Sequence, residues 1–236
     1  MDAALARAFE ETWPAAEYAD AGGFRVGRGL GAGGRVSSAR AVGAWVSNDI
    51  AAAEAIHRGW GQQPMFRVLD SDTDLVAALT AAGYRRDTPT AIMEALVSAL
   101  TDRPIPPLTT FAIWPPLAIQ RDIWAAGNIT PSRQAVMDRV AAPKTAILGR
   151  IDDRAAGAAF AAVCDAVAMV HAVEVLPAFR RRGLAGWMMR QVALWAAEQG
   201  AARIGLAVSR ANTGARATYD RLGFAEIAGY AYYAKL

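Results

Sequence analysis

The C-terminal part of the chain alternates between apolar runs of strand length and longer apolar stretches of helix length. An apolar helix is expected from about Ala185 to Gln199, because Gly200 follows it as a natural C-terminal cap. The pattern predicts strands near 173–175, 203–208 and 230–234, and helices over 185–199 and 213–219.

The same order of elements is expected earlier in the chain, as a strand over 66–70, a short helix over 75–84 and a strand around 91–95. Both helices end in glycine followed by an aromatic residue, and laying Gly83 over Gly223 puts Leu79 in the place of Tyr219. This correspondence favours an internal structural repeat. The alternative is that any strand–helix–strand unit with this ending would align in the same way.

A proline-rich segment separates the two parts. Residues 103–108 include three prolines, which fit neither a helix interior nor a central strand. We therefore expect two halves, residues 1–103 and residues 104–236. In the first half Asn48 is expected to act as an ordinary N-cap for a helix that opens at Ala51.

One glycine-rich stretch imitates a dinucleotide-binding motif. Residues 29–34 contain Gly-x-Gly-x-x-Gly, a fingerprint that requires a strand before it and a helix after it. Residues 35–42 alternate like a strand instead, so we expect a glycine-rich hairpin turn here.

Composition is that of a globular protein, with 54% hydrophobic and 20% charged residues among 236. No apolar run is long enough to span a membrane, and no basic stretch precedes an apolar segment at the N-terminus, so neither a membrane anchor nor secretion is expected. The single Cys164 cannot form an internal disulfide and fits a reducing cytoplasm. We expect it to be a packed side chain rather than a reactive thiol.

The net charge of +3 is mild. Proteins that bind nucleic acids usually present a broad basic face with interleaved aromatic residues, and no such stripe occurs here. Nucleic-acid binding is therefore not expected, and no metal-ligand set is assigned.

The most informative chemistry lies just after the strand at 173–175. Pro177 ends that strand, and Arg180, Arg181, Arg182 and Gly183 then lead into an apolar helix. Such a turn presents backbone N–H groups at a helix N-terminus, where a phosphate can approach the glycine closely. A pyrophosphate is the expected ligand.

Arg180-x-x-Gly183-x-Ala185, followed by Asn212 and by Tyr219 with Leu-Gly-Phe behind it, resembles the GCN5-related N-acetyltransferase (GNAT) superfamily. The resemblance extends over about 145–236. It implies an α/β (α+β) fold with a mixed, mostly antiparallel central sheet flanked by helices. The first half would then be a second, smaller and degenerate GNAT-like half.

The resemblance implies acetyl-CoA as acyl donor and assigns residues to it. A strand that splays from its neighbour would pair with the pantetheine arm through its backbone, and the basic turn would hold the pyrophosphate. The implied binding residues are Val173, Glu174, Val175, Arg180, Arg181, Arg182, Gly183, Leu184, Ala185, Gly186 and Asn212.

Tyr219 is the expected general acid, since a phenol can protonate a departing thiolate. It is otherwise an aromatic residue on the packed face of a helix. Asn212 contacts the donor by resemblance, and helix capping would also explain an asparagine there.

The general base is less determined, with Glu174 favoured and His171 as the alternative. Odd and even positions of a strand face opposite sides, so the two side chains are not expected to share a site. Family members that acetylate ribosomal-protein N-termini carry a glutamate where Ala207 stands here, which counts against that substrate.

These features predict a cytoplasmic N-acetyltransferase, monomeric or homodimeric, that transfers acetyl from acetyl-CoA to the primary amine of a small molecule by direct attack in a ternary complex. The alternative is a non-catalytic acyl-CoA-binding module with a regulatory or interaction role. A second alternative keeps the enzyme and changes the donor to a longer acyl-CoA.

Overall fold

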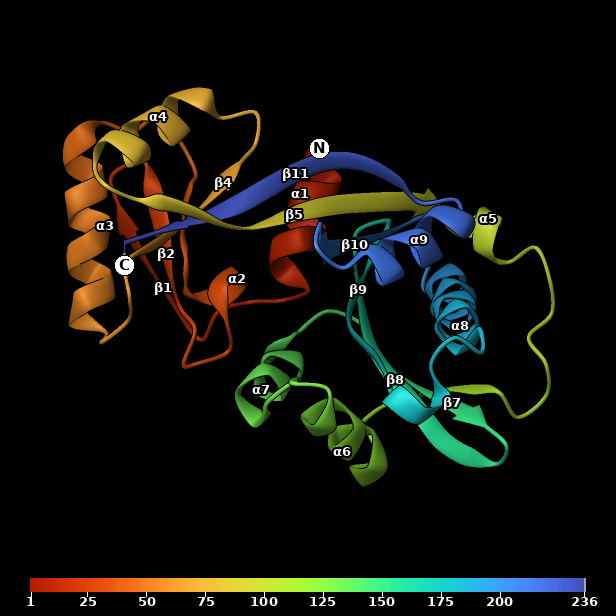
Figure 1. Ribbon diagram of the computed structural model, residues 1–236. Coiled ribbons are helices and arrows are strands. Elements are labelled where there is room, and N and C mark those ends of the chain that lie inside the picture. The colour runs from red at the N-terminus through yellow and green to blue at the C-terminus, as the bar shows by residue number, and fades with distance from the viewer. Residues whose placement is uncertain (236) are drawn as a thin grey trace. The chain divides into compact units, whose positions relative to one another are not determined.

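The computed structural model describes residues 1–235 and divides the chain into two compact units (Figure 1). The first unit consists of Met1–Trp13, Ile92–Val208 and Asn212–Ile227, and the second consists of Pro14–Ala91, Ser209–Ala211 and Ala228–Leu236. Neither unit is a continuous stretch of chain. The sequence predicted a boundary at residue 103 between two related halves. The two compact units divide the chain differently, so that boundary stays a prediction.

The first unit includes five neighbouring strands in the order β6-β7-β8-β9-β10. Neighbouring strands are antiparallel except for β9 and β10, which are parallel. This agrees with the expected mixed, mostly antiparallel sheet. The strands are β6 (Thr110–Ile113), β7 (Lys144–Ile151), β8 (Arg154–Cys164), β9 (Val167–Val175) and β10 (Arg203–Ser209).

Helices cover both faces of this sheet. They are α1 (Ala3–Glu11), α5 (Val97–Leu100), α6 (Ala118–Ala126), α7 (Pro131–Arg139), α8 (Leu184–Glu198) and α9 (Thr213–Arg221). On one face, α6 and α7 pack their apolar side chains against alternate residues of β7 and β8, including Leu148 and Phe160. On the other face, α8 brings Met188 against Gly149 and Gly157, and a Cβ at Gly149 would collide with that side chain. Figure 1 shows α6 and α7 on one side of the strands and α8 on the other.

The second unit has its own core. Its strands are β1 (Glu17–Ala21), β2 (Phe24–Arg28), β3 (Ala39–Ala41) and β4 (Met65–Leu69), together with the later part of β11 (Ala225–Ala234). The helices are α2 (Gly34–Ser37), α3 (Ser47–Gly59) and α4 (Thr73–Ala81). Phe66 lies at the centre of the core, with ring centroids 5.3 Å from those of both Phe24 and Tyr84.

Two local expectations in the second unit are wrong. The glycine-rich stretch connects antiparallel strands β2 and β3, as a hairpin would, but a one-turn helix occupies Gly34–Ser37 where a strand was expected. Helix α3 begins at Ser47 rather than at Ala51, because the Asp49 carboxylate accepts from the backbone N–H of Val46 at 3.1 Å and so places Asn48 inside the first turn.

The two strand–helix–strand segments that suggested a repeat have the same local geometry. Asp72 and Asn212 each accept a hydrogen bond from the backbone three residues later, at 3.2 and 3.1 Å. Gly83 and Gly223 each follow the helix with φ near +85°, at 85° and 83°. The strands after the two helices, β5 (Arg85–Leu96) and β11, are longer than the pattern predicted.

Candidate active site

The turn between β9 and α8 has the backbone shape of an anion-binding loop. A single 3₁₀ turn (Pro177–Phe179) follows the strand, and Arg181 and Gly183 then adopt left-handed conformations, with φ of 65° and 83°. Gly183 is the N-cap of α8. Alternation of left- and right-handed residues directs successive N–H groups to one side, and the helix N-terminus adds its positive end.

Strands β9 and β10 separate next to this turn. Their registered pairing runs from Val167 with Arg203 to Val170 with Leu206. Beyond that point β9 continues to Val175, with Glu174 and Val175 paired only to β8 among the described residues. The expected splay is present, and it leaves one backbone edge of 173–175 without a strand partner.

A β-bulge lies where the two strands part. Phe160 of β8 pairs with His171, and Ala158 pairs with Glu174, so Ala159 stands opposite two residues of β9. Within this bulge Ala172 has a φ of 52°. The extra residue changes the parity of the strand, so His171 and Glu174 lie on the same face. The expectation that they face opposite sides is therefore wrong.

Sharing a face does not bring the two side chains into one site. The His171 ring stacks near Trp13 and Phe160, and its Nε2 lies 2.9 Å from the Thr12 hydroxyl. That hydroxyl donates to the carbonyl of Ala8 at 2.6 Å, so its oxygen accepts the Nε2 proton. His171 is thus buried beneath α1.

A cavity of about 1000 Å³ lies between the splayed end of β9, the turn before α8, and α9. It brings together all but one of the residues predicted from sequence. Those that line it are Val173, Glu174, Val175, Arg180, Arg181, Gly183, Leu184, Ala185, Gly186, Asn212 and Tyr219.

Arg182 is the predicted residue that is absent from this lining. Its guanidinium forms a paired hydrogen bond with the Asp152 carboxylate, at 2.9 and 3.1 Å, in the turn between β7 and β8. The side chain therefore points away from the cavity and ties the basic turn to the neighbouring hairpin.

Arg180 folds back onto the end of β9. Its Nε donates to the carbonyl of Val175 at 2.8 Å, and its Nη2 donates to the Glu174 carboxylate at 2.9 Å. The Glu174 side chain is only 13% exposed. It fits because Gly127, just after α6, has no Cβ; a Cβ there would lie 2.3 Å from the carboxylate carbon.

Tyr219 and Asn212 reach the cavity from α9. Asn212 is the N-cap of that helix, as its alternative reading predicted, and it also lines the cavity. Tyr219 is 7% exposed, and burial raises the pKa of its hydroxyl to about 12. Within residues 1–235 that hydroxyl has no hydrogen-bond partner.

Further lining residues were missed from sequence. They are Phe179, Thr213, Gly214, Ala215, Ala217, Thr218, Arg221 and Leu222. Most lie on α9, and the signal that could have found them is its helical period, since a helix with Asn212 and Tyr219 on one side also presents the residues between them. Arg221 adds a further cation.

Other groups with possible chemistry lie elsewhere. Cys164 does not line the cavity, and burial, followed by the charges of Asp165 and Glu11, raises the pKa of its thiol. No cluster of metal-ligating side chains occurs in the part of the chain that the structure describes. That part also contains no helix with the length and apolar character of a membrane span.

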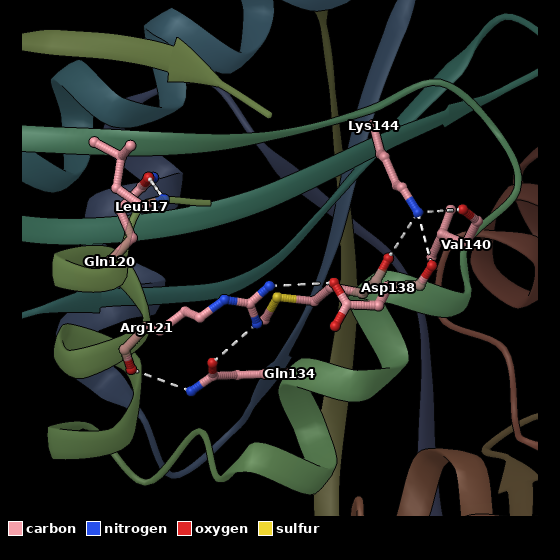
Figure 2. A network of polar contacts seen from close by, with 8 residues as sticks. Leu117, Gln120, Arg121, Gln134, Asp138, Val140 and Lys144 are labelled. Carbon is pink, nitrogen blue, oxygen red and sulfur yellow. Dashed lines mark hydrogen bonds and ion pairs between the residues drawn. The ribbon is translucent and has the colours of Figure 1, made fainter. Parts of the chain in front are cut away.

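Helices α6 and α7, which flank Glu174 on one side, are joined by a polar network (Figure 2). Gln134 of α7 is buried, and its side-chain amide donates to the carbonyls of Arg121 and Ile129 at 3.1 and 3.0 Å. Lys144 contacts three carbonyl oxygens at the end of α7, at 2.6 to 3.2 Å. Helices α6 and α7 are therefore held together as one layer against β8 and β9.

Comparison with known proteins agrees with this geometry. Residues 113–224 match the family model of the acetyltransferase (GNAT) family. A GCN5-related N-acetyltransferase from Kribbella flavida is 18% identical, with a TM-score of 0.73 over 98% of this chain and 93% of that chain. One from Sphaerobacter thermophilus is 17% identical, with a TM-score of 0.60 over 80% of this chain and 67% of that chain.

A tandem GNAT protein from the clavulanic acid biosynthesis pathway is 14% identical, with a TM-score of 0.59 over 83% of this chain and 74% of that chain. No curated protein matches the chain in sequence. These structural likenesses, all below 25% identity, concern the fold alone. Residues 113–224, which include every lining residue of the cavity, are similar in sequence to the GNAT acetyltransferase family.

Proposed function

We propose that the chain transfers the acetyl group of acetyl-CoA to the primary amine of a small molecule, by direct attack within a ternary complex. The observation that carries the proposal is the single cavity that joins a phosphate-binding turn, an unpaired strand edge and a buried phenol. These are the parts that acetyl transfer from a thioester requires.

The donor fits the chain at both ends of the cavity. The left-handed residues Arg181 and Gly183, with the first turn of α8, suit a pyrophosphate. The free edge of 173–175 suits the amides of the pantetheine arm, and an N–H of this edge would polarise the thioester carbonyl. Acetyl-CoA supplies the activated acetyl group.

Tyr219 is the proposed general acid. Its burial keeps the phenol protonated far above neutral pH, so it can donate a hydrogen bond to the sulfur and then the proton to the thiolate. The buried position on α9 also excludes water from the leaving group.

Glu174 is the proposed general base, acting on the amine directly or through a water molecule. It lines the cavity beside the strand edge, whereas the His171 Nε2 proton is engaged by Thr12. Arg180 holds the carboxylate in place from the side of the basic turn.

Direct attack is favoured because the only cysteine, Cys164, is not among the lining residues and its thiol is disfavoured as a thiolate. The second candidate function is a non-catalytic acyl-CoA-binding module. It would need the turn and the strand edge but no acid, so the role of Tyr219 separates the two.

The matching geometry of the segments after β4 and β10 supports the proposal that the first half, residues 1–103, is a degenerate GNAT-like half beside a catalytic half at 104–236. Leu79 in place of Tyr219 would make the first half unable to donate a proton.

Titration calorimetry with acetyl-CoA tests the donor site, with Gly183→Glu and Gly200→Glu as matched variants. Both glycines have positive φ, 83° and 78°, and at neither would a Cβ meet another atom within 4 Å, but only Gly183 lines the cavity. We expect micromolar binding that Gly183→Glu abolishes and Gly200→Glu retains. Absence of binding by the unaltered protein would overturn the proposed function.

A further inference from the structure

We propose that Trp124 is a positioning residue for the reaction, because its indole fixes the β-bulge that opens the strand edge at 173–175. The inference rests on the proposed function. Trp124 lies in the last turn of α6, is fully buried, and takes no part in lining the cavity.

The bulge needs an anchor because its backbone is unfavourable. Ala172 has a φ of 52°, which costs a residue with a Cβ more than it would cost glycine. The Trp124 Nε1 donates to the carbonyl of Ala172 at 2.9 Å. That hydrogen bond holds the peptide group in the orientation that a regular strand would not give it.

The position of this bond along β9 determines its effect. Pairing with β10 ends at Val170, and the residues that face the cavity begin at Val173. Ala172 lies between these two regions, so the orientation of its carbonyl decides where the strand edge points.

The same turn of chain supports β9 at a second point. Three residues after Trp124, Gly127 leaves the space that the Glu174 carboxylate occupies. The end of α6 therefore fixes both the bulge and the proposed base. The network that joins α6 to α7 through Gln134 keeps this end in place (Figure 2).

The test removes the indole N–H and keeps an aromatic ring. Trp124→Phe is expected to lower kcat about three- to tenfold at saturating acetyl-CoA, the size of one lost hydrogen bond. Amide hydrogen exchange at 172–175 should rise in parallel, while that of β7 is unchanged. Trp195→Phe is the control, because the Trp195 indole has no hydrogen bond among residues 1–235.

A second substitution separates positioning from general support of the core. Glycine adopts the conformation of Ala172 without the penalty, so Ala172→Gly in the Trp124→Phe background should restore at least half of the lost turnover. A merely structural defect would not recover. Failure of rescue, or unchanged exchange at 172–175 in Trp124→Phe, would overturn the inference.

One measurement needs neither a variant nor a ligand. The Trp124 indole N–H should exchange with solvent as slowly as the amides between β8 and β9, and exchange as fast as that of Trp195 would overturn the positioning role. The exchange measurements hold even if acetyl-CoA does not bind, which would overturn the proposed function alone.

Discussion

The phenol of Tyr219 is held in its proton-donating form. Burial raises its pKa from 10.0 to about 12, so the hydroxyl stays protonated throughout an ordinary assay range. We expect Tyr219→Phe to lower kcat by about 10²- to 10⁴-fold with the Kd for acetyl-CoA unchanged. The ratio of the two rates should be constant from pH 6 to about pH 10. Equal turnover by the variant and the unaltered protein would show that Tyr219 is not the general acid.

A different pH dependence is expected for Glu174. Glu174→Gln should lower kcat/KM about 100-fold at neutral pH, because the amine then lacks a group to accept its proton. The deficit should shrink as pH rises and the amine deprotonates in solution. His171→Asn serves as the control, since that ring contacts Thr12 and not the cavity. A larger loss of kcat/KM in His171→Asn than in Glu174→Gln would indicate that His171, and not Glu174, is the general base.

The sequence predicted the placement of some site residues and not of others. Tyr219 and Asn212 both line the cavity, because their spacing follows the helical period of α9. Arg182 contacts Asp152 instead of the cavity. That partner lies thirty positions earlier in the chain, so no local sequence pattern predicts the contact. The bulge at Ala172 likewise places His171 and Glu174 on the same face of the strand, and the alternation of side chains in the sequence does not reveal it.

At the scale of elements, α4 and α9 make a matched pair. Asp72→Ala and Asn212→Ala each remove one N-cap hydrogen bond, and each should reduce the free energy of unfolding by about 1 kcal/mol. Only Asn212→Ala should also raise the KM for acetyl-CoA, since Asn212 lines the cavity. Denaturant unfolding and initial rates measure both; an equal KM effect in the two variants would contradict the assignment.

Elements bounded by glycine were predicted most closely. Helix α8 was expected over 185–199 and occupies Leu184–Glu198, because Gly200 terminates it with a φ of 78°. Strands β5 and β11 are longer than predicted, since their ends are fixed by pairing with distant strands rather than by local residues. The start of α3 was misjudged because Asp49, not Asn48, satisfies the first N–H groups.

At the scale of the molecule, acid stability of the second unit should depend on Glu54. Burial alone would raise its pKa, but hydrogen bonds from Lys235, Tyr84 and Arg58 outweigh burial and lower the pKa from 4.5 to about 2. This carboxylate therefore stabilises the fold by roughly 3 kcal/mol above pH 4.5, and the contribution is lost as pH falls toward 2.

Urea unfolding of Glu54→Gln and the unaltered protein should therefore differ at pH 7 and converge near pH 2. The Tyr84 hydroxyl lies 2.7 Å from the carboxylate, so Tyr84→Phe offers a milder companion variant. A difference that persists undiminished at pH 2 would show that the substitution acts through packing rather than charge.

The division of the chain into interleaved units has a consequence for synthesis on the ribosome. Each unit combines residues from the first hundred positions with residues that follow position 200, so segments far apart in the sequence must come together before either is complete. Domains commonly fold in turn during translation, from the N-terminus. Here both units stay incomplete until strand β11 has been made, because its residues 225–227 belong to the first unit and its residues 228–234 to the second.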